Sequence, residues 1–251
     1  MIHFLYFFSG YVFEAYDVNR KQKVAVKRTQ KAGNVVSREY EVLCLLRGAP
    51  NVVNLVDFFY SLDSKERIIQ NTVMEFCDCS LEDKLRKAEK NKQALNMIHI
   101  KHYCWQIFNG LKHMHAQKIS HRDLKPENIL IKAPEGLQQS ASEVDPLQCE
   151  VKICDLGAAK VLDPKNLNTP YVVSRYYRAP ELILGSHYYD CSIDIWATGC
   201  ILFELIARTP LFPGDAEGLQ ILEQAQIKGM PNERELEELK KICEQPVMQL
   251  L

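Results

Sequence analysis

The spacing of hydrophobic residues predicts strands in the first third of the chain. An apolar run at residues 2–8 and an alternation of small and branched residues at 24–27 are both typical of strands. Two further strands are predicted at residues 54–60 and 68–76. Residues 34–47 instead carry hydrophobic side chains three and four positions apart, which is the period of an amphipathic helix. This part of the chain is therefore predicted to form a sheet with one helix beside it.

Helical spacing dominates the rest of the chain. Ser80 followed by Asp83 is a signal for the start of a short helix. Helices are also predicted at residues 191–208 and 232–244, with a short strand at 151–154. We expect a long apolar stripe that precedes these segments to lie in the core. Its residues are Ile100, Tyr103, Cys104, Ile107, Phe108, Leu111 and Met114.

Two segments stand out from these patterns. Residues 133–150 are rich in Pro, Gly, Gln, Ser and acidic residues, which predicts an insertion loop. The helix predicted at 191–208 carries Asp194 among apolar side chains. Because burial removes water from a carboxylate, we expect Asp194 to accept hydrogen bonds from nearby groups.

Composition and charge are those of a globular protein. The chain has 251 residues, of which 47% are hydrophobic and 25% charged, enough for one large domain or two smaller lobes. Its net charge of −1 argues against nucleic acid as the main partner, and no stretch resembles a membrane span. The nine cysteines include no Cys-x-x-Cys pair, which is typical of reduced thiols. We therefore expect an intracellular protein of the cytoplasm, the nucleus or both, with no nucleic-acid or membrane partner.

One loop concentrates the candidate chemistry. Residues 121–130 read His-Arg-Asp-Leu-Lys-Pro-Glu-Asn-Ile-Leu, and Pro126 disfavours a helix there. Asp123 could accept a proton, Lys125 could neutralise an anion, and Asn128 offers a neutral oxygen that suits a hard cation. These groups suit the positioning of a phosphate ester and a hydroxyl, although a charged surface turn could carry the same residues.

Three further motifs follow the same order as in a known family. Val-Ala-Val-Lys ends at Lys27, Asp-Leu-Gly occupies residues 155–157, and Ala-Pro-Glu occupies residues 179–181. Together with the loop described above, they resemble the signature of eukaryotic protein kinases. The resemblance implies an α+β fold of two lobes. The expected domain is a β-rich N-lobe over residues 1–77 and an α-helical C-lobe over residues 78–251 that is truncated at its C-terminus.

The likeness narrows to one group of kinases. Residues 174–183, Ser-Arg-Tyr-Tyr-Arg-Ala-Pro-Glu-Leu-Ile, and residues 210–215, Pro-Leu-Phe-Pro-Gly-Asp, resemble the CMGC group. Within it they are most similar to the glycogen synthase kinase-3, or shaggy-like, kinases. Glu39 falls where that family has an ion-pair glutamate, and Tyr171 where it has the activation-loop tyrosine that is phosphorylated.

The resemblance implies transfer of the γ-phosphate of ATP to serine or threonine in proteins, with Mg²⁺ as the second cofactor. Asn128 and Asp155 would bind the metal. Asp123 would accept the proton of the substrate hydroxyl, and Lys125 would neutralise the transferred group. A lysine at this position favours a serine/threonine kinase over a tyrosine kinase.

The resemblance also implies a nucleotide pocket. Lys27, paired with Glu39, would hold the α- and β-phosphates, and Asp194 would bind the backbone of the catalytic loop. Each remaining position could equally be an ordinary core residue. These positions are Gly10, Val12, Ala25, Met74 as the gatekeeper, Glu75 and Cys77 in the hinge, Leu130 and Cys154.

Three cations suggest a preference for phosphorylated substrates. Arg38, Arg122 and Lys160 match positions where glycogen synthase kinase-3 binds a phosphate already on its substrate. Arginine suits this task because its planar group can contact two phosphate oxygens at once. The alternative is that these cations only dock a phosphorylated or acidic part of the protein's own activation loop.

Two features depart from the kinase pattern. The glycine-rich loop keeps only Gly10, and side chains at Leu5 and Phe7 would obstruct the approach of the backbone to phosphates. The chain also ends before the arginine that in this family pairs with the glutamate at position Glu181. The alternative prediction is therefore a pseudokinase or truncated kinase that acts as a binding or scaffold module. A regulatory or scaffold protein would then cover an exposed apolar surface.

Overall fold

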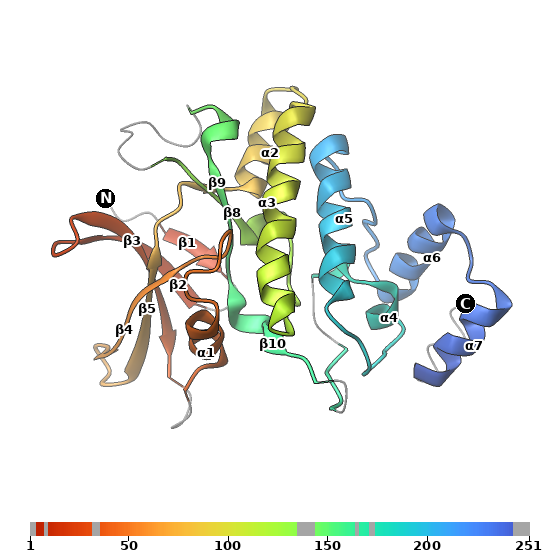
Figure 1. Cartoon of the computed structure of the whole chain (residues 1–251), viewed down its shortest axis with the longest axis horizontal. Helices are drawn as coiled ribbons and strands as arrows, with labels where there is room; N and C mark the ends of the chain where they lie inside the picture. The colour runs from red at the N-terminus through yellow and green to blue at the C-terminus, as the bar shows by residue number, and fades with distance from the viewer. Residues whose placement is uncertain are drawn as a thin grey trace.

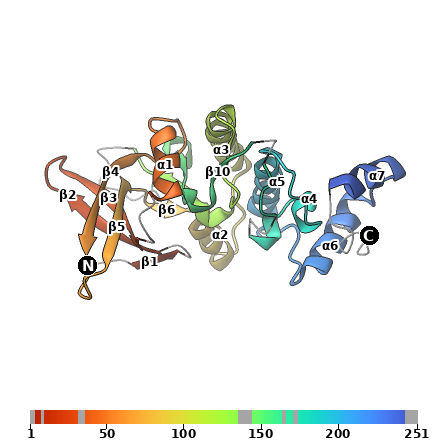
Figure 2. The same ribbon diagram turned by 90° about the horizontal axis from the view of Figure 1, so that it is seen from below.

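The computed structural model places a sheet at one end of the molecule and helices across the rest (Figure 1). Seen from below, the sheet and α7 lie at opposite ends (Figure 2). The described residues are 4–7, 10–31, 36–134, 144–163, 166–170 and 174–242, with side chains described between residues 11 and 238.

The first sheet has five antiparallel strands in the order β1-β2-β3-β5-β4, and α1 lies on the same side of the molecule. We call the sheet and α1 the N-lobe. The strands predicted in this region are present. The elements are β1 Phe4–Phe7, β2 Gly10–Asp17, β3 Gln22–Gln30, α1 Arg38–Leu45, β4 Leu55–Leu62 and β5 Ile68–Glu75.

Helix α1 begins later than hydrophobic spacing predicts. The side-chain oxygen of Ser37 accepts a hydrogen bond of 3.3 Å from the backbone N–H of Tyr40, which is a typical N-cap. Val36 precedes this cap and is 44% exposed. The prediction of a helix from residue 34 is therefore wrong at its start, because the cap satisfies a first-turn N–H that hydrophobic spacing does not consider.

The rest of the chain forms a mainly helical C-lobe. Ser80 caps α2 together with Asp83, as the sequence predicts, and each side chain bonds the backbone of the other. Helix α6 is additional to the predicted helices. The helices are α2 Leu81–Lys90, α3 Met97–Ala116, α4 Pro180–Ile183, α5 Ser192–Ala207, α6 Glu217–Lys228 and α7 Glu233–Ile242.

The core of the C-lobe lies between α3, α5 and the short strands. The predicted apolar stripe of α3 is buried except at Phe108, which is 41% exposed, so the prediction is wrong for that residue. At about 100° per residue, Phe108 lies at the edge of the stripe and not at its centre, so its side chain is the one that meets solvent. Within the described residues, no helix is both long and apolar enough to span a bilayer.

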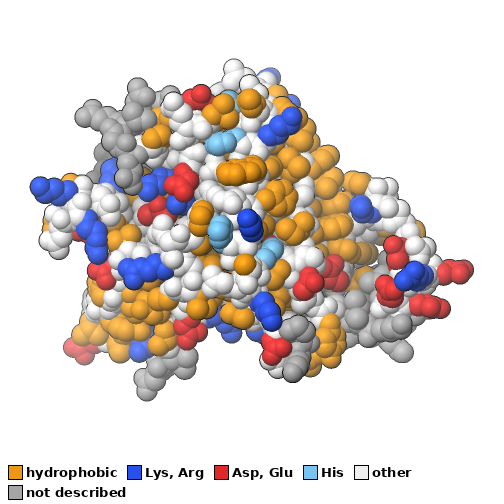
Figure 3. Space-filling view, viewed as in Figure 1, with side chains coloured by type: hydrophobic (Ala, Val, Ile, Leu, Met, Phe, Trp, Pro, Cys, Tyr) orange, Lys and Arg blue, Asp and Glu red, His pale blue; other side chains and the backbone are white. Residues whose placement is uncertain are grey.

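Hydrophobic side chains also gather on the surface of the C-lobe (Figure 3). Large apolar side chains are exposed on three helices. Examples are Trp105 on α3, Phe203 and Ile206 on α5, and Leu222 and Ile227 on α6.

Two small antiparallel sheets position the loop at residues 121–128. This loop runs between β7 and β8, and Asp155 follows β9. The strands are β6 Cys79–Ser80, β8 Ile129–Lys132 and β9 Glu150–Ile153 in one sheet, and β7 Ile119–Ser120 and β10 Lys160–Val161 in the other. In the described part of the chain there are also short 3₁₀ turns: η1 Pro126–Asn128, η2 Pro146–Gln148, η3 Leu156–Ala158 and η4 Arg175–Tyr177. Most of the predicted insertion loop, residues 135–143, lies outside the described residues.

A glycine in α3 tests this packing. A Cβ atom at Gly110 would lie 2.8 Å from the backbone oxygen of Asn51 and 2.9 Å from Cδ1 of Ile153. We expect Gly110→Ala to lower the free energy of unfolding by about 1–3 kcal/mol, because overpacking outweighs the better helix propensity of alanine. Urea unfolding of the purified protein measures the change.

The matched control is Gly199→Ala on α5, where no atom lies within 4 Å of the added Cβ. That variant should gain up to about 1 kcal/mol from helix propensity. Equal effects of the two substitutions would contradict the close contact at Gly110.

Candidate active site

The loop at residues 121–128 is held by one buried carboxylate. Asp194 lies on α5 with 1% of its surface exposed. Its Oδ1 accepts the backbone N–H of Arg122 at 3.0 Å, and its Oδ2 accepts that of His121 at 2.9 Å. The hydroxyl of Ser120 at 3.0 Å and Nε2 of His115 at 2.9 Å also bond Oδ2. The expected role of Asp194 in binding the loop backbone is confirmed.

His121 links the loop to the end of β9. Its ring is fully buried, and Nε2 lies 2.8 Å from the backbone oxygen of Cys154. The other ring nitrogen accepts the backbone N–H of Asp123 at 3.2 Å. A neutral ring with its hydrogen on Nε2 makes both bonds at once. Asp123 and Asp155, which follows Cys154, are thereby held in one arrangement.

Asp123 and Lys125 both form hydrogen bonds with the hydroxyl of Ser174. Oδ1 of Asp123 accepts hydrogen bonds from the Ser174 hydroxyl at 2.9 Å and from the Ser174 backbone N–H at 3.0 Å. Nζ of Lys125 donates to the same hydroxyl oxygen at 3.2 Å and lies 3.3 Å from Oδ2 of Asp123. Sequence reasoning gave Ser174 no role, although its place at the start of the motif at residues 174–183 was the available signal.

Asn128, on the same loop, has a side-chain oxygen that accepts no hydrogen bond from the described residues. The residue is fully buried at the end of η1, and its Nδ2 donates to the backbone oxygen and to Oδ2 of Asp123 at 2.8 and 3.2 Å. Among the described residues, none donates a hydrogen bond to Oδ1 of Asn128. A buried amide oxygen without a donor suits a hard cation such as Mg²⁺.

Lys27 brings the two lobes together. Its Nζ lies 2.6 Å from Oε1 of Glu39 on α1 and 2.8 Å from Oδ1 of Asp155 after β9. Only 3% of Lys27 is exposed. Asp155 itself has a left-handed backbone with φ of 56°, which turns the chain sharply after the strand. The predicted pair of Lys27 and Glu39 is present, and Asp155 joins it.

The charges of Lys27, Glu39 and Asp155 depend on one another. Burial by itself would lower the pKa of Lys27, but the carboxylates of Glu39 and Asp155 outweigh it and raise that pKa. Burial raises the pKa of Glu39, and the attraction of Lys27 only partly offsets this shift. Lys27 therefore remains an ammonium at neutral pH, while two carboxylates compete for it.

The residues predicted to line an adenine pocket come from both lobes. Val12, Met74 and Cys154 are buried, whereas Ala25 and Leu130 are partly exposed. Ala25 lies opposite Met74 in the β3–β5 register. Burial raises the pKa of the Cys154 thiol, and the negative charge of Asp155 adds to the shift. The Cys154 thiol is therefore neutral at neutral pH.

Gly10, Glu75 and Cys77 complete the predicted pocket. Gly10 opens β2 opposite Phe7, and Glu75 ends β5. Cys77 lies in the hinge, the segment between β5 and β6. Burial, followed by the charge of Glu75, raises the pKa of the Cys77 thiol.

Comparison with known proteins agrees with this arrangement. The model of the protein kinase domain matches residues 8–251. The chain belongs to the protein kinase family. It is 36% identical over 228 residues to the serine/threonine-protein kinase RIM11/MSD1 of Saccharomyces cerevisiae, and 33% identical over 228 residues to the protein kinase gsk3 of Schizosaccharomyces pombe.

The chain spans a little more than half the length of each of these two relatives. Both matches cover 90% of this chain, but 58% of the Saccharomyces protein and 55% of the Schizosaccharomyces protein. The likeness to gsk3 confirms the resemblance to glycogen synthase kinase-3 that the motif at residues 174–183 predicts. The two-lobed α+β kinase fold is confirmed as well.

The three cations of the expected phosphate site lie around the start of the kinase's activation segment, the residues after Asp155. Arg122 is buried and donates from Nε to the backbone oxygen of Ala158 at 2.7 Å. Lys160 donates to Oδ1 of Asn168 at 2.6 Å. Arg38 is exposed in the first turn of α1, which packs against η3.

Nη1 of Arg122 also donates to the hydroxyl of Tyr189 at 3.1 Å. All of these acceptors are uncharged oxygens, so the bonds leave the positive charges of Arg122 and Lys160 in place. Among the described residues, no carboxylate forms an ion pair with any of the three cations. Tyr171, the predicted phosphorylation position, lies outside the described residues.

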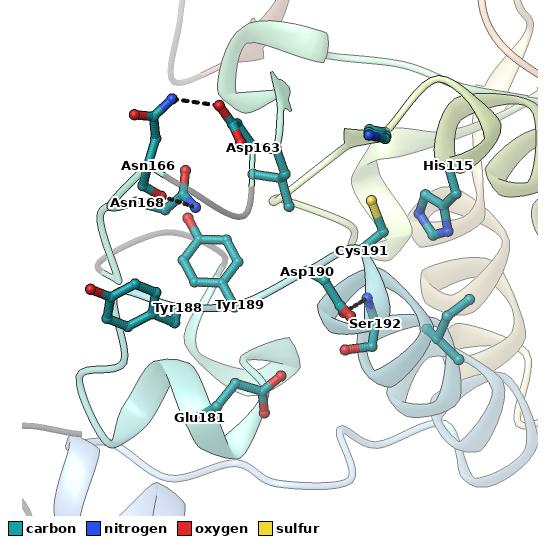
Figure 4. A pocket seen from close by; sticks show the side chains of 13 residues that line it. His115, Asp163, Asn166, Asn168, Glu181, Tyr188, Tyr189, Asp190, Cys191 and Ser192 are labelled. Atoms are coloured by element: carbon teal, nitrogen blue, oxygen red, sulfur yellow. Dashed lines mark hydrogen bonds between the residues drawn. The ribbon is translucent and has the colours of Figure 1, made fainter. Parts of the chain in front are cut away.

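A separate cavity of about 790 Å³ lies beyond the catalytic loop (Figure 4). It is lined by the end of α3, the activation segment, α4 and the start of α5, including His115, Asn168, Glu181 and Asp190. None of the predicted nucleotide or metal residues that are described lines it. The residues predicted for phosphoryl transfer, around Lys27 and Asp123, therefore lie outside this cavity.

Removal of one charge should loosen the catalytic loop. In Asp194→Asn an amide N–H₂ replaces one acceptor oxygen and faces N–H donors of the loop. We expect the free energy of unfolding to fall by about 1.5–3 kcal/mol, the typical value of a hydrogen bond to a charged group. Chemical denaturation measures it.

Asp190→Asn is the matched control. Asp190 is exposed and its Oδ1 accepts the backbone N–H of Ser192 at 2.7 Å. This variant should change the free energy of unfolding by about 0.5 kcal/mol or less. If both variants lost the same stability, the anchoring role of Asp194 would be refuted.

Proposed function

We propose that this chain is the catalytic domain of a serine/threonine protein kinase that transfers the γ-phosphate of ATP. The observation that carries the proposal is the buried Lys27 ammonium, held at 2.6 Å by Glu39 and at 2.8 Å by Asp155. One cation thus connects the sheet, α1 and the residue proposed to bind metal. A nucleotide placed between the lobes would meet this cation with its phosphates.

The residues present fit a bound Mg²⁺. Asn128 offers a buried oxygen that has no donor among the described residues. Asp155 follows Cys154, whose backbone N–H donates to the backbone oxygen of Asn128 at 2.9 Å. We propose Asn128 and Asp155 as the metal-binding residues. When bound, Mg²⁺ and ATP supply the charge compensation and the phosphoryl group of the reaction.

Asp123 is the proposed acceptor of the substrate proton. The hydroxyl of Ser174 already lies 2.9 Å from Oδ1 of Asp123, which supports the ability of this carboxylate to orient a hydroxyl group. Lys125 donates to the same hydroxyl, so a cation is available beside the position where charge moves.

Eight cysteines lie in the described part of the chain, and all of them are free thiols. This supports the proposed intracellular location.

Substitution of the proposed base tests the activity. We expect Asp123→Asn to lower kcat by about 10²–10⁴-fold, because proton acceptance is lost while the nucleotide contacts remain. Transfer of labelled γ-phosphate from Mg-ATP to a serine peptide measures kcat, and Mg-ATP binding is measured on the same samples. Asp57→Asn, at an exposed position in β4, should retain full transfer.

A folded wild-type protein that transferred no phosphate would contradict the kinase proposal. The binding-module alternative would then replace the kinase proposal. The next experiment would be to identify a partner that covers the exposed apolar side chains of α3 and α5.

We further propose that the kinase prefers substrates that already carry a phosphate. Arg122 bonds a neutral oxygen at the start of the activation segment, Lys160 lies in that segment and bonds the neutral Oδ1 of Asn168, and Arg38 is exposed on the helix that packs there. This excess of positive charge supports the binding of an anion on the substrate.

Arg38→Gln tests the preference at an exposed site where folding should be unaffected. We expect KM for a phosphorylated peptide to rise about tenfold, roughly the 1.5 kcal/mol of one charged hydrogen bond, while KM for its unphosphorylated twin stays the same. Arg47→Gln, an exposed arginine just after α1, is the control and should change neither value. Equal rates on the two peptides in the wild type would favour docking of the protein's own loop instead.

A further inference from the structure

Four charged side chains cluster behind the hinge. Glu75 ends β5 in the N-lobe, Lys132 ends β8, and Glu150 and Lys152 lie on β9 in the C-lobe. We call these four residues the hinge cluster. Formal charges balance within it, with two carboxylates and two ammonium groups.

Glu75 is the member that joins the lobes. Its Oε2 lies 2.9 Å from Nζ of Lys132, and its Oε1 lies 3.3 Å from Nζ of Lys152. The same Oε1 accepts the backbone N–H of Asn54 at 2.9 Å, just before β4. One carboxylate therefore connects two strands of the N-lobe sheet to two strands of the C-lobe.

The cluster lies beside one wall of the proposed adenine pocket. Leu130 and Lys132 alternate onto one face of β8, and Leu130 pairs with Lys152 across the ladder. The opposite face of this ribbon, with Ile129 and Ile131, is fully buried in the C-lobe core. The face with Leu130 is therefore the one that meets the hinge.

The hinge backbone is tied to the same strand. Asp78 donates its N–H to the backbone oxygen of Ile131 at 2.9 Å, and its Oδ2 accepts the N–H of Ala133 at 2.8 Å. These bonds and the contact between Glu75 and Lys132 lie at either end of the short hinge segment. Cys77 lies between them, and both lysines of the cluster oppose the rise in its pKa that burial causes.

Burial makes the cluster sensitive to loss of one charge. The side chain of Lys152 is only 6% exposed, and its other partner, Glu150 at 2.7 Å, is 44% exposed. Loss of the Glu75 carboxylate would leave the buried ammonium of Lys152 with the half-exposed Glu150 as its remaining carboxylate partner. A buried charge without its partner is costly, whereas removal of both partners is often neutral.

We propose that Glu75, through Lys132 and Lys152, is a positioning residue that holds the hinge against Leu130 and so preforms the adenine pocket. The expected effect of Glu75 on nucleotide affinity rests on the proposed kinase function. Its effect on the geometry of the hinge is independent of that function. Preorganisation of this kind acts on binding, so it should change KM for Mg-ATP more than kcat.

A double-mutant cycle tests the proposal, with Glu75→Gln, Lys152→Met and the two combined. We expect Glu75→Gln to raise KM for Mg-ATP at least about 5-fold with kcat within about twofold, and amide exchange at Asp78 to become at least about 5-fold faster. The double variant should show effects no larger than those of Glu75→Gln alone, because the contact between the two side chains is already lost. Lys132→Gln, at a more exposed member, serves if Glu75→Gln does not fold, with the same expected direction.

The control cycle uses Glu82 and Arg86, an ion pair of 2.5 Å on the surface of α2 within the C-lobe. Glu82→Gln and Arg86→Gln should leave KM and the exchange at Asp78 unchanged. Additive effects of Glu75→Gln and Lys152→Met, or unchanged exchange at Asp78, would overturn the proposal. If the wild type bound no Mg-ATP, the proposed function would fail, and the exchange measurements would still decide the role of Glu75.

Discussion

The buried carboxylate of Asp194 is the constraint on which the catalytic loop depends. Four donors reach it, two of them backbone N–H groups of the loop itself. A loop of this kind would otherwise carry unpaired N–H groups next to an apolar core, which costs free energy. The carboxylate satisfies them from α5, so the most apolar helix of the C-lobe determines where Asp123 and Asn128 lie. This explains why a charge is kept inside such a helix.

The second constraint is electrostatic and connects the lobes. Lys27 on β3 contacts both Glu39 and Asp155, so the position of α1 and that of the segment after β9 depend on one ammonium group. With Glu75 and its two lysines behind the hinge, buried charge appears on both sides of the predicted pocket. Each cluster joins residues of the sheet to residues of the helical lobe. These charged contacts act together with the backbone hydrogen bonds between residues 51–53 and Ile153, and with the apolar core that the two lobes share.

Local signals predicted the elements well and their edges less well. The N-cap at Ser80 was readable because its partner Asp83 is only three residues away. The start of α1 was missed because Ser37 has no acidic residue three positions later to complete a capping box. The exposure of Phe108 was not readable, because the position of neighbouring helices decides it. Helix α6 carries a weak apolar pattern with buried Gln220 and Gln224, so hydrophobic spacing did not indicate it.

The sequence by itself determined the family, the order of the motifs and the residue types available for chemistry, because these depend on neighbours along the chain. Tertiary structure alone decided which of those residues meet. Lys27 and Asp155 are 128 positions apart, and Lys132 and Glu75 are 57 apart. Only packing of the sheets against α3 and α5 brings such pairs within bonding distance. The contact of Ser174 with Asp123 and the unsatisfied oxygen of Asn128 likewise follow from three-dimensional placement, since no spacing along the chain encodes a hydrogen bond between distant loops.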